Sequence, residues 1–316
     1  MALSHERAVR PRVLALRALG LGDFCTAVPA FRALRRAFPQ HELVLAAPAW
    51  QGPLAALAGI DRVAPTLALA PVPRREAVPA VAVNLHGRGP QSTQRLLDIA
   101  PDRLICFRHP VLPQTDESPR WSQDEHEVQR WCRLLREYAI DADPTELGLQ
   151  RPRLRSRAAE RVVIHAGAAA EGRRWPPRHF ASVARRLLDQ GEYIVLTGTA
   201  DEQSIADAIV TDLGCDRSGA VLNMCGRTSI QELCAIVAEA RAVVSNDTGA
   251  AHLAYAYRVP SVVLFGPTSP ERWGPPPGPH VALWRGQSGD PHAAQLHSGL
   301  ASITPDEVSD ALASLI

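Results

Sequence analysis

The chain has 316 residues, of which 46% are hydrophobic and 21% charged, and its formal net charge is +1. At roughly 150 residues per domain, this length predicts two globular domains with enough apolar residues for two cores. A net charge so close to zero argues against binding to nucleic acid or another polyanion as the main role. All 34 basic residues are arginine, so any contact that lysine usually makes falls to arginine here.

The cysteines and the apolar runs indicate a cytoplasmic protein. Six cysteines occur, at positions 25, 106, 132, 215, 225 and 234. They lack C-x-x-C pairs and zinc-ligand spacing, so we expect no metal site and interpret them as reduced, buried apolar residues. The apolar runs are far shorter than the ~18 residues of a membrane span. Arg17 also interrupts the segment that would form the core of a signal peptide.

The first half alternates short apolar runs with helical segments. Strands are predicted at residues 13–16, 43–46 and 81–85. One continuous helix is predicted at residues 23–38, with Pro29 near its start. Ser122 and Glu125 form a capping-box pattern that predicts a helix from Ser122 to about residue 137. This alternation is typical of βαβ units with a parallel sheet.

The turn after the first predicted strand carries Gly20, Gly22 and Asp23. The two glycines permit a tight turn and a close backbone approach to a ligand. A dinucleotide-binding fingerprint is weak here, because Cys25 stands where a third glycine is needed and Glu42 precedes the second strand instead of following it. The charged form of Asp23 is favoured near a helix N-terminus, which suits a catalytic base. The alternative is that Asp23 only caps the helix.

The alternation lapses between Asp141 and Arg157, and we place the domain linker there. The predicted domains are residues 1–150 and 151–316, with the terminal helix on the second domain or packed back on the first. Asp141 and Asp143 have the spacing of a metal-binding carboxylate pair. They lie in this loop and outside the ends of the strands, so a metal role is not expected.

The second half repeats the alternation of strands and helices. Strands are predicted at residues 161–165, 193–196, 243–245 and 262–265. Helices are predicted at residues 178–189, 201–213, 229–238, 250–256 and 306–315. The simplest architecture is an α/β fold of two Rossmann-like domains, whose parallel sheets face each other across a cleft.

Two loops of the second half carry candidate ligand-binding residues. A run of small residues after the strand at 161–165 leads to Arg173 and Arg174. Such a loop can approach a phosphate closely, and an arginine can bind it through two hydrogen bonds. We assign this role to Arg173 and expect Arg174 to be solvated. Glu202 follows the strand at 193–196 and either caps the next helix or holds a ribose or base.

The turn Asp247-Thr248-Gly249 is the most informative segment, because it joins a buried strand to a helix. Amide groups of a helix N-terminus at the carboxyl end of a parallel strand commonly bind phosphate. A carboxylate beside a phosphate is unfavourable unless it binds something else, such as sugar hydroxyls. The alternative is an ordinary turn in which Asp247 or Thr248 caps the helix.

Taken together, these segments resemble the heptosyltransferase family of glycosyltransferases, family 9. The resemblance spans nearly the whole chain. It rests on the ordered set formed by the glycine turn ending at Asp23, Asn84-Leu85-His86-Gly87, Arg173-Arg174-Trp175-Pro176, Gly198 to Glu202, Gly226-Arg227-Thr228-Ser229, Ser245 to His252, and Phe265-Gly266-Pro267-Thr268.

The resemblance implies a GT-B fold, inversion at the anomeric carbon, no metal and no cofactor. It implies an ADP-heptose co-substrate in the C-terminal domain and an acceptor in the N-terminal domain. The acceptor would be a glycan, a glycolipid or a secondary metabolite, with peripheral membrane contact if it is a lipid. By position, the resemblance implies a catalytic base at Asp23, diphosphate contacts at Arg173, Thr248 and Gly249, sugar contacts at Asp247 and His252, and a nucleoside contact at Glu202.

Three other functions stay open on the sequence. The first is a GT-B transferase or epimerase that uses another nucleotide sugar, such as a UDP-sugar. The second is a catalytically silent protein that binds sugar nucleotides, against which the presence of both Asp23 and Arg173 argues. The third is a nicotinamide-dependent Rossmann enzyme, which the incomplete glycine fingerprint disfavours.

Overall fold

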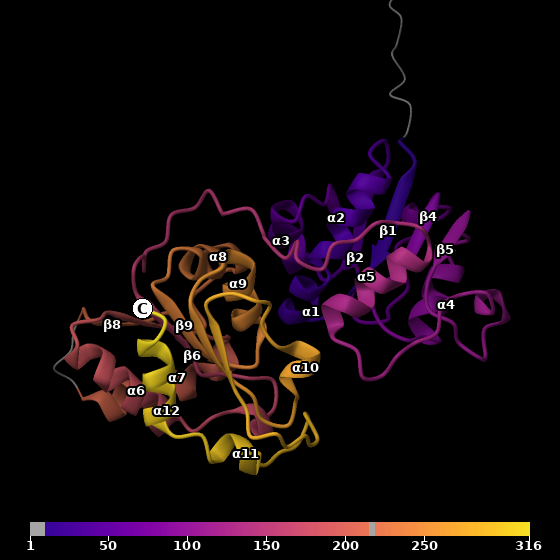
Figure 1. Cartoon of the computed structure of the whole chain (residues 1–316). Helices are drawn as coiled ribbons and strands as arrows, with labels where there is room; N and C mark the ends of the chain where they lie inside the picture. Colours follow the sequence, from indigo (N-terminus) through magenta and orange to yellow (C-terminus); the bar gives the residue numbers. More distant parts are fainter. Residues whose placement is uncertain (1–9, 215–218) are drawn as a thin grey trace, which may run out of the picture. The chain divides into compact units, whose positions relative to one another are not determined.

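The computed structural model describes residues 10–214 and 219–316, so Cys215 lies outside the described residues. The chain forms two compact units, each built around one parallel sheet (Figure 1). Among the described residues, unit 1 comprises residues 10–19, Ala27–Gln123 and Val128–Glu146. Unit 2 comprises Gly20–Thr26, Asp124–Glu127 and Leu147–Ile316.

The sheet of unit 1 has the strand order β3-β2-β1-β4-β5, and all of its pairs are parallel. Its strands are β1 (Arg12–Leu16), β2 (Glu42–Ala47), β3 (Arg62–Pro65), β4 (Val81–Asn84) and β5 (Arg103–Ile105). The three predicted strands are confirmed as β1, β2 and β4. They lie in the centre of the sheet, where both faces are covered and apolar runs are continuous. The edge strands β3 and β5 each bury a single residue, so no apolar run marks them.

Unit 1 as described has four α-helices, and the sequence predicted a helix in the segments of the first and the last. They are α2 (Val28–Ala37), α3 (Gly52–Leu57), α4 (Gln91–Leu97) and α5 (Glu127–Glu137), the last starting at the junction of the units. The single helix predicted at residues 23–38 is wrong. It is split at Ala27 into α1 (Leu21–Thr26) and α2, because Pro29 lacks an N–H and fits only in the first turn of a helix.

The helix predicted to start at Ser122 is also wrong in its start. The Arg130 guanidinium donates through Nη2 to the carbonyl groups of Ser122 (3.0 Å) and Gln123 (3.1 Å). These carbonyls are therefore bound by a side chain instead of by the amides of a helical turn. The helix α5 begins at Glu127.

The sheet of unit 2 has the strand order β11-β10-β9-β6-β7-β8, again with parallel pairs throughout. Its strands are β6 (Val162–His165), β7 (Ile194–Leu196), β8 (Val221–Asn223), β9 (Ala242–Asn246), β10 (Ser261–Leu264) and β11 (His280–Leu283). The four predicted strands are confirmed as β6, β7, β9 and β10. The strands that the sequence missed, β8 and β11, are half-buried edge strands.

The main helices of unit 2 form two groups (Figure 1). One group contains α6 (Pro177–Asp189), α7 (Gln203–Leu213) and the terminal α12 (Pro305–Ala313), which packs on α6. The other contains α8 (Ile230–Ala238) and α9 (Gly249–Tyr257). Short helices complete the unit: α10 (Pro270–Trp273), α11 (Ser298–Ala301), η4 (Glu171–Arg173) and η5 (Ala200–Glu202). None of the described helices has the length and apolar character needed to cross a membrane.

Candidate functional site

The candidate site lies where the connections of the second sheet change direction, between β6 and β9. Ligands of open parallel sheets bind outside the carboxyl ends of the strands at such a point. The buried Asn246 side chain ties the loops together at this edge. Its Nδ2 donates to the carbonyls of Ala166 (2.8 Å) and Gly167 (3.2 Å), and its Oδ1 accepts from the Trp175 amide (3.1 Å). The loop after β6 and the turn after β9 are therefore held in one arrangement.

Arg173 and Asp247, two residues singled out in the sequence, are in direct contact. The Arg173 Nη2 donates to Asp247 Oδ2 at 3.0 Å and also to the Asp247 carbonyl oxygen. Burial raises the pKa of Asp247 to about 6, and the Arg173 guanidinium opposes that rise. The carboxylate is thus costly to keep charged here, which is typical of functional sites.

Four buried polar atoms in this corner of unit 2 have no hydrogen-bond partner among the described residues. They are Arg173 Nε, Ser245 Oγ, Thr248 Oγ1 and Tyr255 Oη. Buried polar atoms in native proteins are nearly always bonded to protein, ordered water or a ligand. Thr248 occupies the N-cap position of α9, but its side chain makes no capping hydrogen bond. An ordinary helix cap therefore does not account for the Thr248 side chain at this turn.

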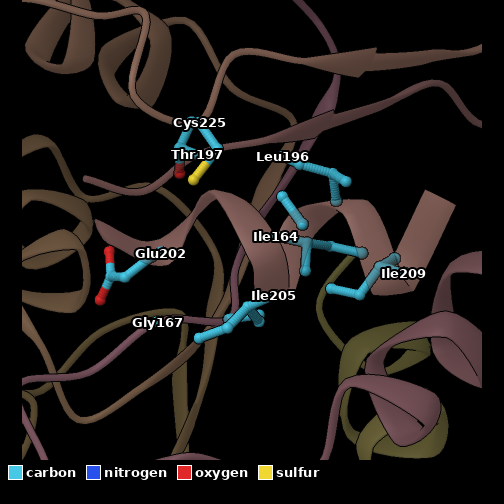
Figure 2. Close-up of a pocket in the computed structure, with 10 residues that line it drawn as sticks. Ile164, Gly167, Leu196, Thr197, Glu202, Ile205, Ile209 and Cys225 are labelled. Atoms are coloured by element: carbon cyan, nitrogen blue, oxygen red, sulfur yellow. The ribbon is translucent and has the colours of Figure 1, made fainter. Parts of the chain in front are cut away.

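Glu202 lines a recess at the carboxyl ends of β6 and β7 (Figure 2). Its Oε2 accepts from the Thr199 amide at 2.8 Å, within a capping box that opens η5. The carboxylate lies directly over Gly167, because a Cβ at that position would be 2.0 Å from the Glu202 Cδ. The cavity in this recess has a volume of only about 10 Å³, and Thr197 and Cys225 also line it. Glu202 therefore caps a helix, which is one of the two roles that the sequence left open, and its side chain also lines a recess.

His165 is a buried residue of this edge to which the sequence gave no role. It ends β6, and its Nδ1 lies 3.0 Å from the Thr197 hydroxyl. Burial lowers the pKa of His165, and the charge on Glu202 opposes the shift. A neutral imidazole therefore bridges the loops after β6 and β7. The only signal in the sequence was its place at the end of a buried strand.

The helix α1, which carries Asp23, packs against the start of α9. A Cβ at Gly22 would come within 2.9 Å of the His252 ring, and a Cβ at Gly249 within 2.6 Å of Leu21. Both glycines are thus required by the contact between the two helices. Asp23 lies in the first turn of α1, where its Oδ2 accepts from the Gly20 amide at 3.3 Å.

The position of α1 differs from the sequence-based expectation. The sequence placed Asp23 on the domain opposite the phosphate-binding loops. In the structure, Gly20–Thr26 belongs to unit 2, together with Arg173 and the turn after β9. The physical reason is the absence of side chains at Gly22 and Gly249, which lets α1 approach α9 closely.

His252 is buried on α9 within a group of aromatic rings. Its ring packs edge-on against Tyr255, with centroids 5.3 Å apart, and against Trp273 at 6.1 Å. Thr248, Gly249 and Asp247 lie at the start of the same helix. The residues that the sequence grouped as diphosphate-binding and sugar-binding are therefore brought together by one strand–helix junction.

The family model of glycosyltransferase family 9 (heptosyltransferase) matches residues 112–295, which is more than half of the chain. This chain belongs to glycosyltransferase family 9. The family 9 chain is 32% identical over 238 residues to lipopolysaccharide heptosyltransferase 2 of Escherichia coli K12, a match that covers 72% of this chain and 62% of that protein. It is 27% identical over 226 residues to lipooligosaccharide heptosyltransferase 2 of Haemophilus influenzae, covering 67% of this chain and 60% of the relative. The match thus spans about three fifths of the length of each relative.

A solved structure confirms the fold of this family 9 chain. The structure of E. coli ADP-heptose lps heptosyltransferase II superimposes with a TM-score of 0.80 at 22% sequence identity. The superposition covers 96% of this chain and 98% of the other. The predicted GT-B class, with two Rossmann-like parallel sheets, is therefore confirmed.

The described cysteines of this family 9 chain form no disulfide. Cys25, Cys106, Cys132, Cys225 and Cys234 are free and buried, as predicted. Burial raises the pKa of Cys132 to about 12 and that of Cys225 to about 11, so both are thiols at neutral pH. Within residues 10–214 and 219–316, no three His, Cys, Asp or Glu side chains gather in a way that could hold a metal ion.

Proposed function

We propose that this protein is an inverting glycosyltransferase that moves a heptose from ADP-heptose to a hydroxyl group of an acceptor. The observation that carries the proposal is the corner around Asp247, where a buried carboxylate accompanies four buried polar atoms that have no partner among the described residues. A sugar diphosphate supplies hydroxyl groups for the carboxylate and anionic oxygens for the donors. The names of two relatives, lipopolysaccharide heptosyltransferase 2 and lipooligosaccharide heptosyltransferase 2, support the same substrate class.

The residues of the corner divide between the parts of the donor. The free Nε of Arg173, the Thr248 hydroxyl and the first amides of α9, from Gly249 on, would bind the diphosphate. Asp247 would accept hydrogen bonds from sugar hydroxyls, with His252 beside it. Glu202, at the carboxyl ends of β6 and β7, would bind the nucleoside.

The proposed reaction needs one base and several donors to the leaving group. The acceptor oxygen attacks the anomeric carbon, its proton passes to the Asp23 carboxylate, and the C–O bond to the diphosphate breaks with its electron pair leaving on ADP. Attack from the face opposite the leaving group inverts the anomeric centre. Arg173 and the start of α9 would stabilise the charge that develops on the diphosphate, so we propose that the transfer needs no metal.

The acceptor is proposed to be a glycan, a glycolipid or a small secondary metabolite with a free hydroxyl group. We propose a cytoplasmic location for the reaction, with peripheral contact to a membrane if the acceptor carries a lipid.

Calorimetric titration tests the proposal directly. The protein should bind ADP and bind ADP-heptose more tightly, with and without EDTA, and should bind UDP and NAD at least about tenfold more weakly. In the absence of acceptor, slow release of ADP from ADP-heptose is expected. Tighter binding of UDP than of ADP would show that the donor is a UDP-sugar instead of ADP-heptose. Binding of ADP-heptose without any turnover would favour a catalytically silent binding protein.

Gly167→Ala should weaken ADP binding by about tenfold or more. The added methyl group would fall on the Glu202 carboxylate, and overpacking of this kind costs about 1–3 kcal/mol. The measurement is the Kd of ADP. Gly52→Ala is the control, since a Cβ at Gly52 meets nothing within 4 Å. Unchanged ADP affinity in Gly167→Ala would remove Glu202 from the nucleoside site.

The contribution of the sugar to donor affinity should decrease as the pH falls through about 6. Asp247 has a pKa of about 6, and only its charged form accepts two hydrogen bonds per oxygen from sugar hydroxyls. The measurement is the ratio of Kd for ADP to Kd for ADP-heptose between pH 5 and pH 8. The control is Asp247→Asn, which lacks the titrating carboxylate. It shows how much of the change comes from the terminal phosphate of ADP, which itself titrates with a pKa of about 6.

A lower ratio of the two Kd values at acid pH would not result from unfolding caused by protonation of Asp247. Its pKa in the folded protein lies above the ordinary value of 3.8, so protonation of Asp247 favours the folded state as the pH falls from about 6 toward 4. A ratio that changes equally in the wild type and in Asp247→Asn would contradict the prediction.

A further inference from the structure

Tyr255 is a buried residue of α9 whose hydroxyl group has no hydrogen-bond partner among the described residues. Its side chain is held by rings on both sides. The ring of Tyr255 packs edge-on against His252 at 5.3 Å and against His280 at 4.9 Å between centroids. His280 is itself fixed, because its Nδ1 lies 2.9 Å from the Ser261 hydroxyl. The tyrosine ring is therefore placed firmly while its polar end is left unsatisfied.

The direction of the Tyr255 side chain brings that polar end toward the start of α9. Thr248, His252 and Tyr255 are spaced four and three residues apart, so they share one face of the helix. Side chains on a helix lean toward its N-terminus, which here is the end that carries Asp247. The charge on Asp247 is also near enough to help raise the pKa of Tyr255, in addition to burial. The hydroxyl therefore keeps its proton and lies in the region of the carboxylate.

We propose that the Tyr255 hydroxyl binds the sugar of the donor beside Asp247. This inference rests on the proposed function and deepens it by adding a sugar contact that the sequence did not reveal. A charged carboxylate can only accept hydrogen bonds, whereas a phenol can donate one as well. Asp247 and Tyr255 together could bind a pair of neighbouring hydroxyls on the heptose, one as a donor to the protein and the other as an acceptor.

The inference has a consequence for stability that a purely structural tyrosine would not have. A buried hydroxyl without a partner destabilises the folded protein, because no hydrogen bond offsets its loss of contact with water. Phenylalanine keeps the ring and its contacts but removes that hydroxyl. Tyr255→Phe should therefore raise the melting temperature of the ligand-free protein by about 2–4 °C.

The test compares Tyr255→Phe with Tyr257→Phe in the full chain. Tyr257 lies two residues further along the same helix, and its hydroxyl donates to the Gln150 carbonyl at 3.4 Å. Calorimetry at pH 8 would give the Kd of ADP and of ADP-heptose for both variants and the wild type. We expect Tyr255→Phe to keep the ADP affinity within about twofold and to lower the ADP-to-ADP-heptose affinity ratio by about 5–10-fold, as the loss of one hydrogen bond would. Tyr257→Phe should leave the ratio unchanged and lower the melting temperature.

The outcomes separate the inference from the proposed function. If the wild type binds ADP-heptose and Tyr255→Phe keeps the full ratio, the role of Tyr255 is overturned and the proposed function stands. A melting temperature that falls in Tyr255→Phe, with no change in the ratio, would show that the hydroxyl is bonded structurally, for example by water. If the wild type binds neither ligand, the proposed function is overturned and the assignment of Tyr255 falls with it.

Discussion

Asp23→Asn is expected to lower kcat by roughly 10²–10⁴-fold, the range that removal of a general base typically costs. The substitution changes the shape of the side chain little, and an asparagine oxygen can still accept from the Gly20 amide. It removes the negative charge of the side chain and its ability to take a proton from the acceptor. The affinity for ADP should stay within about twofold, because Asp23 is not assigned to the donor. The measurements are single-turnover transfer rates and the Kd of ADP.

A matched control separates catalysis from helix capping. Glu232 accepts from the Ser229 amide at 2.8 Å in the capping box that opens α8, much as Asp23 accepts from Gly20. Glu232→Gln should leave kcat unchanged. If Asp23→Asn behaves like Glu232→Gln, Asp23 only starts its helix and the catalytic base must be sought elsewhere.

Arg173→Ala is expected to lower kcat/KM by roughly 10²–10³-fold, since loss of one donor to a developing anion costs about 3 kcal/mol. It should also weaken ADP binding. The variant leaves the buried Asp247 carboxylate without its cation, so the pKa of Asp247 should rise further above its value of about 6. Stability should fall by about 2–3 kcal/mol, less than for a fully buried pair, because 24% of the Arg173 side chain is exposed.

Arg174→Ala is the control for this prediction. Arg174 donates through Nε to the Ala168 carbonyl at 2.9 Å and pairs at 3.6 Å with the largely exposed Glu171. Its removal should leave kcat/KM within about threefold. A variant Arg173→Ala that loses stability but keeps kcat/KM and ADP affinity would show that Arg173 serves only to neutralise Asp247.

The central strands and the loops after them could be predicted from the sequence, because buried parallel strands are continuous apolar runs. The runs at β1, β6 and β9 are of this kind. The edge strands could not, since β5 and β8 have only three residues each and are partly exposed. The predicted start of a helix was wrong where contacts with other side chains determine the backbone conformation. This is the case at Ser122, whose carbonyl is bound by Arg130.

The sequence could predict only those residues of the candidate site that lie in the loops after predicted strands and whose side chains suit a ligand. Arg173 and Asp247 were found in this way, and the structure brings them into contact. Tyr255 could not be found, because its position on α9 looks like that of any buried aromatic residue. Only the missing partner of its hydroxyl distinguishes it, and that depends on every neighbour in the fold.

The packing of α1 against α9 has a consequence for any dissection of the chain. Unit 2 is assembled from three separate stretches of sequence, and the two short ones precede the long one by many residues. One of them supplies α1, and the other supplies His126, whose Nε2 lies 3.2 Å from the Gly274 carbonyl. A fragment cut at the linker and beginning at Leu147 would leave bare the side of α9 that Leu21 covers at Gly249. The two compact units therefore do not coincide with the two halves of the sequence, and a cut at the linker would divide unit 2 between two polypeptides.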